Sequence, residues 1–253
     1  MKAIILAAGE GKRLGELTKT TPKCLAISLN GKTLLELQVQ VFHSAGIRDI
    51  VIVVGHAGSA IQNSNLRVCW NYDYAETGIL DSLFAAEHEL NEDVIISYSD
   101  IWYEQSVLRS LLQNDDDITI AIDRNWEPAY EGRTAHPISE AEKVALDSNN
   151  RVVRIGKMGI SQDVDGEFIG LLKLTQSGCG ITKTHYLRAR ETSLEKPFQR
   201  ASSFRTAYLT DLLQEMIDHG TKVTATEVKG RWREIDTVQD LERFQLQTQR
   251  ISR

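Results

Sequence analysis

The first 23 residues most constrain what this chain can fold into. A compact apolar run, Ala3 to Leu6, suits a strand that is buried on both faces. It leads into Ala7 to Arg13 (AAGEGKR), where small residues let backbone N–H groups approach an anion closely. Lys12 and Arg13 add positive charge there, and Pro22-Lys23 supplies another cation further on. A buried strand, a small-residue loop and several cations predict a site for a polyphosphate.

Two common phosphate-binding motifs do not fit this segment. A Walker A loop needs a glycine five positions before Gly11 and a Ser or Thr after the lysine, where the chain has Leu6 and Arg13. The dinucleotide fingerprint needs a small third residue, and the chain has Leu14 at that position. A tight strand-to-helix turn with surface cations is the structural alternative, but it gives no reason for Arg13 and Lys23 to occur together.

Length and charge exclude several classes of protein. The chain has 253 residues, 42% of them apolar and 25% charged, which predicts one α/β domain or one domain with a small appendage. A net charge of -6 gives no support for a basic groove that binds nucleic acid. No apolar run reaches membrane-spanning length, so no membrane partner is expected, and we interpret the N-terminus as a strand rather than a signal peptide.

The cysteines point to a reducing environment. Cys24, Cys69 and Cys179 are odd in number and widely spaced, so they fit neither a disulfide framework nor a zinc site. We therefore expect a cytoplasmic protein. Cys24 lies beside Lys23 but has no His-Asp arrangement spaced around it, so we expect it to be a small core residue.

Short apolar runs alternate with helical patterns along the first half of the chain. Strands are predicted at 49–54, 66–70, 94–98 and 117–123, in addition to the first one. A capping box, Thr33 with Glu36, opens a helix that Gly46 ends. Five strands with intervening helices predict an α/β fold with a doubly wound, mostly parallel, Rossmann-like sheet.

Polar residues follow the predicted strands where ligands of such sheets gather. Ser99-Asp100 comes at the carboxyl end of strand 94–98, and a carboxylate there is well placed to hold Mg²⁺ that bridges phosphates. A purely structural alternative is that Asp100 caps the N-terminus of a helix at about 105–112. Thr77-Gly78 precedes a helix predicted from about Ile79 to Leu90, whose first N–H groups are either simply capped or offered to a nucleotide.

The pattern changes after Arg124. Residues 125–142 carry aromatic residues, Pro and Gly without clear periodicity, a stretch too long for an ordinary connection and too aromatic for disorder. We interpret them as a lid or wall of an acceptor pocket, followed by a β-hairpin at 144–155. A single domain over 1–253 is expected. Within it, 1–124 and 204–253 would bind nucleotide and metal, and 125–203 would form the acceptor-binding lid region.

The chain as a whole resembles the nucleotidyltransferases that join a nucleoside triphosphate to a phosphorylated small molecule. Their signature is LAAGxGxRL followed by a Pro-Lys pair, and this chain has LAAGEGKRL at 6–14 and then Pro22-Lys23. The resemblance covers nearly the whole chain. It is also carried by YSD at 98–100, DRNWEPAYEGR at 123–133, GEFIGLLKL at 166–174 and EID at 234–236. It implies a fold like that of the nucleotide-diphospho-sugar transferases.

The resemblance also implies roles for residues at matching positions. Asp100 and Asp236 would be the two ligands of one Mg²⁺, although each is also explained as a helix cap, and Arg13 and Lys23 would be catalytic. The residues implied to bind the nucleotide are Leu6, Ala7, Ala8, Gly9, Glu10, Gly11, Lys12, Arg13, Lys23, Thr77, Gly78, Ser82 and Ser99. The residues implied to bind the acceptor are Asp123, Trp126, Tyr130, Arg133, Lys157, Glu167 and Gly170. Among them, Lys157 would bind the phosphate of the acceptor.

The most similar branch is that of the cytidylyltransferases for phosphocholine and for 2-aminoethylphosphonate. We therefore expect a Mg²⁺-dependent enzyme that joins CTP to a small phosphorylated or phosphonate acceptor and releases pyrophosphate. Trp126, Tyr130 or Asp123 would hold an acceptor ammonium. The alternatives are a sugar-1-phosphate nucleotidyltransferase that uses UTP, GTP or dTTP, a silent regulatory subunit and a nucleotide-binding sensor. The acceptor and the formation of a homo-oligomer are left open.

Overall fold

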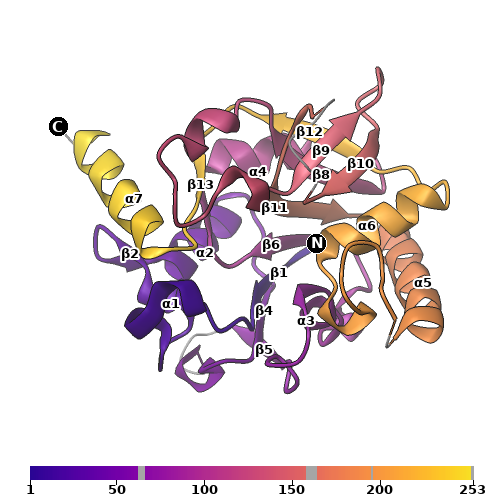
Figure 1. Cartoon of the computed structure of the whole chain (residues 1–253), viewed down its shortest axis with the longest axis horizontal. Helices are drawn as coiled ribbons and strands as arrows, with labels where there is room; N and C mark the ends of the chain where they lie inside the picture. The colour runs from indigo at the N-terminus through magenta and orange to yellow at the C-terminus, as the bar shows by residue number, and fades with distance from the viewer. Residues whose placement is uncertain (62–65, 158–163, 195, 252–253) are drawn as a thin grey trace.

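One large β-sheet forms the centre of the molecule (Figure 1). The computed structural model describes residues 1–61, 66–157, 164–194 and 196–251, and within them the sheet has nine strands. Its order is β10-β9-β11-β6-β1-β4-β5, and β8 joins β12 to β11 beside this path. The strands are β1 (Lys2–Ala7), β4 (Ile50–Val54), β5 (Arg67–Trp70), β6 (Val94–Tyr98), β8 (Ile118–Asp123), β9 (Lys143–Leu146), β10 (Val152–Gly156), β11 (Gly166–Leu174) and β12 (Thr224–Val228).

The half of the sheet formed by β6, β1, β4 and β5 is parallel, as the sequence predicts. Ala3 of β1 pairs with Ile50 of β4 on one side and with Ile95 of β6 on the other. All residues of β1 and β4 are buried, which matches their continuous apolar sequence. Because the four strands run in the same direction, the segments that follow their carboxyl ends meet at one edge of the sheet.

The other half of the sheet is mixed, which agrees with the prediction of a mostly parallel sheet. β11 runs antiparallel to both β6 and β8, and it separates these two strands. This strand comes from the region predicted to form the acceptor lid, so part of that region belongs to the central sheet. The pairing of β11 with β8 shifts between Phe168 and Leu172, around Gly170 at φ +79°. A Cβ on Gly170 would lie 2.7 Å from the Tyr98 ring, so glycine is required there.

Helices cover both faces of the sheet. The α-helices are α1 (Lys23–Ala26), α2 (Leu34–Ser44), α3 (Ile79–Phe84), α4 (Gln105–Leu112), α5 (Gln176–Ser193), α6 (Leu209–Asp218) and α7 (Val238–Ile251). Short 3₁₀ turns occur at Lys12–Thr18, Gly58–Ile61, Glu87–Glu89, Glu127–Tyr130, Ile138–Glu140 and Phe204–Thr206. Figure 1 shows α5 and α6 together at the right of the view, and α7 at the far left.

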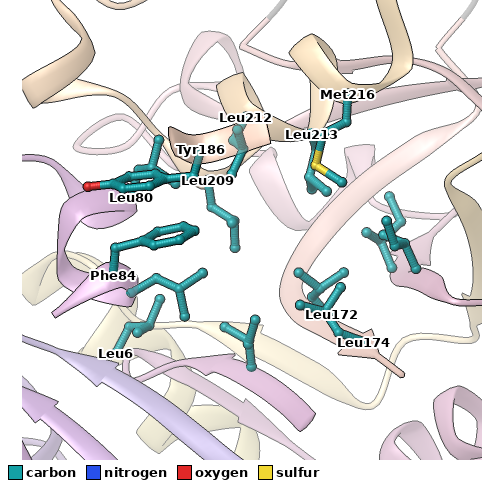
Figure 2. Packing of buried hydrophobic residues seen from close by; sticks show 14 of the residues in the cluster. Leu6, Leu80, Phe84, Leu172, Leu174, Tyr186, Leu209, Leu212, Leu213 and Met216 are labelled. Carbon is teal, nitrogen blue, oxygen red and sulfur yellow. The ribbon is translucent and has the colours of Figure 1, made fainter. Parts of the chain in front are cut away.

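The apolar core has two layers, one on each face of the sheet. Ile4 and Leu6 of β1 pack with residues of α3, α5 and α6. Figure 2 shows this layer, with Leu80 and Phe84 of α3 beside Tyr186 of α5. Ile5 of β1, on the alternate side, packs in the second layer with residues of α2 and α4. This alternation explains why β1 tolerates no polar side chain in its middle.

Several local predictions are confirmed and two are corrected. The Thr33–Glu36 capping box is present, and Cys24 is 1% exposed, with burial raising the pKa of its thiol to about 12. The helix predicted from Ile79 to Leu90 ends at Phe84, and a 3₁₀ turn follows it. The amphipathic sequence at 204–218 predicts one helix from Phe204, but this segment begins as a 3₁₀ turn and α6 starts at Leu209. In the described residues, no helix is long and apolar enough to cross a membrane.

Candidate active site

The loop after β1 lines a cavity of about 400 Å³ at the carboxyl edge of the parallel strands. Gly11 has φ +63°, which L side chains rarely adopt, and it turns the chain into the 3₁₀ segment that begins at Lys12. At Gly9 an added Cβ would meet no atom within 4 Å, so the backbone there is open to the cavity. Every residue predicted to bind the nucleotide lines this one cavity. They are the residues of the loop at 6–13 and Lys23, Thr77, Gly78, Ser82 and Ser99.

A two-stranded ribbon places Asp100 beside Asp236. The strand β7 (Ile101–Tyr103) starts directly after Asp100, and β13 (Trp232–Glu234) ends two residues before Asp236. The two strands pair antiparallel with Glu234 opposite Ile101, and Ile235 N donates to the Asp100 carbonyl oxygen at 2.9 Å. The two aspartates that the sequence predicts as partners therefore meet at the same cavity, together with Arg13 and Lys23.

Lys23 links the two aspartates. Its Nζ donates to Asp100 Oδ2 at 2.9 Å and to Asp236 Oδ1 at 2.5 Å. Arg13 Nη1 donates to the other oxygen of Asp236, Oδ2. Lys23 is 8% exposed, whereas the Arg13 side chain is 50% exposed. One carboxylate thus holds two cations, one fixed in the protein interior and one free to move at the mouth of the cavity.

Electrostatics keep these groups charged. Burial opposes ionisation of Asp236, but the hydrogen bond from His136 and the charges of Lys23 and Arg13 outweigh it and hold the pKa of Asp236 well below its usual range. Burial likewise opposes the charged Lys23 amine, but Asp100 and Asp236 outweigh it and raise the pKa of Lys23. Asp236 is therefore an ionised carboxylate and Lys23 a charged amine, so the two form an ion pair.

The residues present fit a magnesium ion. Asp100 Oδ1 is buried and finds no hydrogen-bond partner among the described residues, although a buried carboxylate oxygen normally has one. Mg²⁺ binds through one or two carboxylates and the phosphates of a substrate. Asp100 and Asp236 supply two carboxylates at the edge of the cavity that the phosphate-type loop lines. Their chemistry matches the predicted ligand pair.

The sequence did not assign roles to two polar residues beside Asp236. His136 Nδ1 lies 2.9 Å from Asp236 Oδ2, and its Nε2 lies 3.5 Å from Glu234 Oε2. Residues 125–142 carry His136 without periodicity, so no spacing rule connects it to the strand ends. Glu234 lies two residues before Asp236 in the EID segment. This short spacing could have indicated that Glu234 lies near the same site.

A second cavity of about 320 Å³ lies on the other side of the aspartates. It shares Arg13, Asp100 and Asp236 with the first cavity, so the two spaces meet at these charged side chains. Lys157 lines it as predicted, and its Nζ donates to Glu140 at 2.8 Å. The rest of its wall includes Glu142, Glu234 and Tyr208. A second small reactant beside the nucleotide cavity fits this arrangement.

This second cavity has an acidic wall. Glu142 accepts a hydrogen bond from Thr210 at 2.8 Å, and burial raises the pKa of Glu142 to about 7. Glu140 and Glu234 line the same space. The Tyr208 ring lies 4.5 Å from the Lys157 amine, measured to the ring centroid. Carboxylates and an aromatic ring together suit an organic cation.

The other predicted acceptor residues lie behind this cavity rather than on it. Asp123, Tyr130, Arg133 and Glu167 line a separate space of about 260 Å³. Arg133 is 8% exposed and donates to Asp240 and Glu234, while the hydroxyl of Tyr130 donates to Glu167. Gly170 lies with Tyr130 and Glu167 around a small space of about 20 Å³ between the two larger ones. These residues therefore lie next to the second cavity rather than on its wall.

Trp126 and Asp123 have structural contacts that explain them without an acceptor. Trp126 is 4% exposed and packs with Tyr130 and Ala141 in a small apolar cluster, and it lines none of the cavities described above. Asp123 accepts hydrogen bonds from Trp232 Nε1 at 2.8 Å and from Asn125 N at 2.9 Å. The structure thus does not bring either residue to the charged centre.

Comparison with known proteins defines the class of protein that this fold and site represent. The sequence pattern of the MobA-like NTP transferase domain matches residues 3–156, and the chain belongs to that family. It is an enzyme of the nucleotidyltransferase class. The matched residues contain the loop at 7–13, Lys23 and Asp100, which all line the first cavity.

Relatives with assigned activities include several cytidylyltransferases. The chain is 30% identical to the CTP:phosphoglutamine cytidylyltransferase of Campylobacter jejuni, over 96% of this chain and 98% of that protein. It is 34% identical to the choline-phosphate cytidylyltransferase of Streptococcus pneumoniae, over 46% of this chain and 49% of that protein. With the 2-aminoethylphosphonate cytidylyltransferase of Lancefieldella rimae it shares 29% identity, over 62% and 61% of the two chains.

Solved structures show the same fold. The CTP:phosphocholine cytidylyltransferase of Streptococcus pneumoniae superposes with a TM-score of 0.71 at 21% identity, over 98% of each chain. The inositol-1-phosphate CTP transferase of T. maritima superposes with a TM-score of 0.73 at 23% identity, over 94% of this chain and 90% of that one. The mixed, mostly parallel sheet with flanking helices is the fold of these nucleotidyltransferases, as the sequence predicts.

Proposed function

We propose that this enzyme transfers the cytidylyl group of CTP to a phosphate or phosphonate oxygen of a small acceptor that carries an amino group, with Mg²⁺ as cofactor. The observation that carries this proposal is the meeting of Arg13, Lys23, Asp100 and Asp236 where two cavities join. One cavity has a loop suited to a triphosphate, and the other has a lysine and an acidic wall. CTP is chosen because the relatives above are named as CTP-dependent enzymes.

The reaction needs little covalent help from the protein. An oxygen of the acceptor attacks the α-phosphorus of CTP, the bond from that phosphorus to the bridging oxygen breaks, and pyrophosphate leaves with the electron pair. The acceptor group is already ionised at neutral pH, so no general base is required. Both reactants are anions, and the protein has to screen their repulsion and align them.

Arg13 and Lys23 supply this screening. Both are held at the junction of the cavities by Asp236, so they face the phosphates of a bound nucleotide without a large rearrangement. Asp100 and Asp236 would hold Mg²⁺, which, when bound, neutralises charge on the reacting phosphates. Gly9, where an added Cβ would meet no atom within 4 Å, leaves room for the polyphosphate against the backbone.

The acidic wall indicates what the acceptor carries at its other end. Lys157 and Arg13 provide positive charge toward the acceptor phosphate, whereas Glu142 and Glu234 provide negative charge in the same cavity. An ammonium group a few atoms from the phosphate would meet these carboxylates. This placement uses Glu142, Glu234 and Tyr208 in the role that the sequence suggested for Trp126, Tyr130 or Asp123.

A matrix of nucleotides and acceptors tests the proposal. Pyrophosphate release is measured with CTP, UTP, GTP or dTTP against phosphoglutamine, phosphocholine, 2-aminoethylphosphonate and a sugar 1-phosphate. The matched control is 2-hydroxyethylphosphonate, which replaces the ammonium with a hydroxyl. A charged hydrogen bond contributes about 1.5–3 kcal/mol, so we expect the amine to be preferred roughly 10-fold to 150-fold in kcat/KM. Turnover with UTP or dTTP and a sugar 1-phosphate alone would contradict the proposal.

A further inference from the structure

The two carboxylate oxygens of Asp236 face two different groups of side chains. Oδ1 accepts from Lys23, which also holds Asp100. Oδ2 faces Arg13 and lies 2.9 Å from His136 Nδ1. We propose that His136, Glu234 and Asp236 form a second divalent-cation site, distinct from the Asp100–Asp236 position, and that it takes a transition metal such as Mn²⁺. The inference rests on the proposed function only in that both use Asp236.

The three donor atoms have the spacing of a metal site. One ligand atom from each of His136, Glu234 and Asp236 can be chosen so that all lie within 4.8 Å of one another. The three side chains are 5%, 25% and 13% exposed, so the donors are largely fixed by their surroundings. They come from two parts of the chain, the loop at 125–142 and the end of β13.

Neighbouring residues hold the donors in place. Glu234 Oε2 accepts from Arg133 Nη2 at 2.9 Å, and Arg133 is itself fixed by Asp240, whose Oδ1 accepts from Nε at 2.6 Å. Asp240 Oδ2 also accepts from the backbone N of Asp236 at 3.1 Å. Second-layer contacts of this kind orient metal ligands in proteins. Arg133 thus orients the Glu234 carboxylate, and Asp240 fixes the backbone at Asp236.

Arg13 is the group that now balances the charge at this position. Its Nη1 lies 3.1 Å from His136 Nδ1 and donates to Asp236. The Arg13 side chain is half exposed, so it can swing toward an incoming polyphosphate while the buried donors stay. Its departure would leave a histidine nitrogen and two carboxylates around one point, a set that a divalent cation would neutralise.

The nitrogen donor decides the class of metal. Mg²⁺ takes oxygen ligands, whereas an imidazole nitrogen is a ligand of divalent transition metals. Mn²⁺ also accepts the carboxylates of this site, and it serves as the paramagnetic probe. A carboxylate shared between two cations about 3.5–4 Å apart is a common arrangement in enzymes that transfer phosphoryl or nucleotidyl groups. We therefore expect Mg²⁺ at Asp100–Asp236 and, when Mn²⁺ is supplied, occupancy of the histidine site as well.

The test uses the full chain with Mn²⁺ and CTP, in the absence of acceptor. Electron paramagnetic resonance counts the bound Mn²⁺, and pulsed measurements detect coupling to the ¹⁴N of a coordinated imidazole. We expect two bound ions per chain and ¹⁴N coupling in the wild-type enzyme. His136→Gln should lose the coupling and one ion, and Glu234→Gln, which keeps the ring, should also fall to one ion.

A control variant separates this site from the other histidine-containing cluster of the described residues, Cys69–His88–Glu89. His88→Gln should keep the ¹⁴N coupling, because the proposal assigns that coupling to His136. Wild-type enzyme without ¹⁴N coupling, or coupling that persists in His136→Gln, would overturn the inference. Pyrophosphate release with Mg²⁺ is measured separately, so the proposed function can hold even when the second site fails.

Discussion

Lys23 Nζ lies 2.5 Å from Asp236 Oδ1 and 2.9 Å from Asp100 Oδ2, so one buried amine joins both predicted metal ligands. A divalent ion that uses the same two carboxylates has to compete with this amine. We expect the proposed nucleotide to resolve this competition, because its polyphosphate would attract Lys23 and release the two carboxylates to the metal. The proposed function thus predicts that nucleotide and metal binding are coupled through Lys23.

Replacing Lys23 separates its two effects. In Lys23→Met we expect kcat/KM to fall by about 100-fold to 1,000-fold, the usual result of removing one charged group that stabilises a transition state. The same change should increase the affinity for Mn²⁺ in the absence of nucleotide, because the competing amine is gone. Steady-state pyrophosphate release and calorimetric Mn²⁺ titration measure the two effects.

Lys19 provides the matched control for this variant. Its side chain is 70% exposed and pairs with Glu16 at the surface. Surface ion pairs contribute about 0–1 kcal/mol, so Lys19→Met should change kcat/KM by no more than about fivefold. Equal losses in the two variants, or unchanged Mn²⁺ affinity in Lys23→Met, would count against the role given to Lys23.

The acceptor cavity should give the enzyme a pH dependence near neutrality. Burial raises the pKa of Glu142 from 4.5 to about 7. The hydrogen bond from Thr210 and the charge of Lys157 oppose the increase, and the charge of Glu234 adds to it. Only ionised Glu142 attracts an ammonium strongly. We expect kcat/KM for an amine-bearing acceptor to increase as pH rises through about 7, and this step to disappear in Glu142→Gln.

The same group has a predictable effect on folding. A carboxyl whose pKa is higher in the folded state than in the unfolded chain binds its proton more tightly when folded. Its contribution to the free energy of unfolding is therefore greatest below pH 4.5 and decreases as pH rises to about 7. Urea unfolding of the wild type and Glu142→Gln between these pH values should show the difference. A wild-type curve identical to that of the variant would contradict the assignment.

Replacing either of two glycines of the first cavity with alanine should affect a different property: protein stability at Gly78 and nucleotide binding at Gly9. A Cβ on Gly78 would lie 2.3 Å from the Ala207 carbonyl oxygen, and backbone cannot yield as a side chain can. We expect Gly78→Ala to lower the free energy of unfolding by about 1–3 kcal/mol. Gly9→Ala meets no atom within 4 Å and should leave stability within about 0.5 kcal/mol while it weakens nucleotide binding. Urea midpoints and CTP titrations measure both.

Lys157 should affect the acceptor and not the nucleotide. It lines the second cavity and is absent from the wall of the first, where CTP is proposed to bind. Loss of a charged hydrogen bond costs about 1.5–3 kcal/mol, so Lys157→Met should raise the acceptor KM roughly 10-fold to 150-fold. Lys222→Met, at a surface pair with Asp116, is the control. A change in the CTP KM alone would contradict the placement of the acceptor.

The sequence grouped residues that line the first cavity because the signals there are local. The loop at 7–13 follows directly from β1, and Asp100 follows directly from β6, so neighbouring parallel strands bring them together. The burial of β1 on both faces and the capping box of α2 are equally local. Short-range pattern and the direction of parallel strands were enough for these features.

The acceptor side could not be predicted to the same degree, because it depends on how distant segments pack. Whether Trp126 faces a cavity or an apolar cluster is decided by Ala141 and Tyr130, not by its own sequence context. The contact of His136 with Asp236 joins residues 100 positions apart. The insertion of β11 between β6 and β8 likewise reflects pairing across the sheet. The periodicity of the sequence predicts none of these three long-range contacts.

Acceptor-dependent release of pyrophosphate from CTP tests the central claim most directly. The account predicts release by the wild-type enzyme only when CTP, Mg²⁺ and an amine-bearing phosphorylated or phosphonate acceptor are all present. Asp100→Asn should lower it by about 100-fold or more, because a charged ligand in the centre is lost. Wild-type enzyme that binds CTP but releases no pyrophosphate with any of these acceptors, or Asp100→Asn with full activity, would contradict the account.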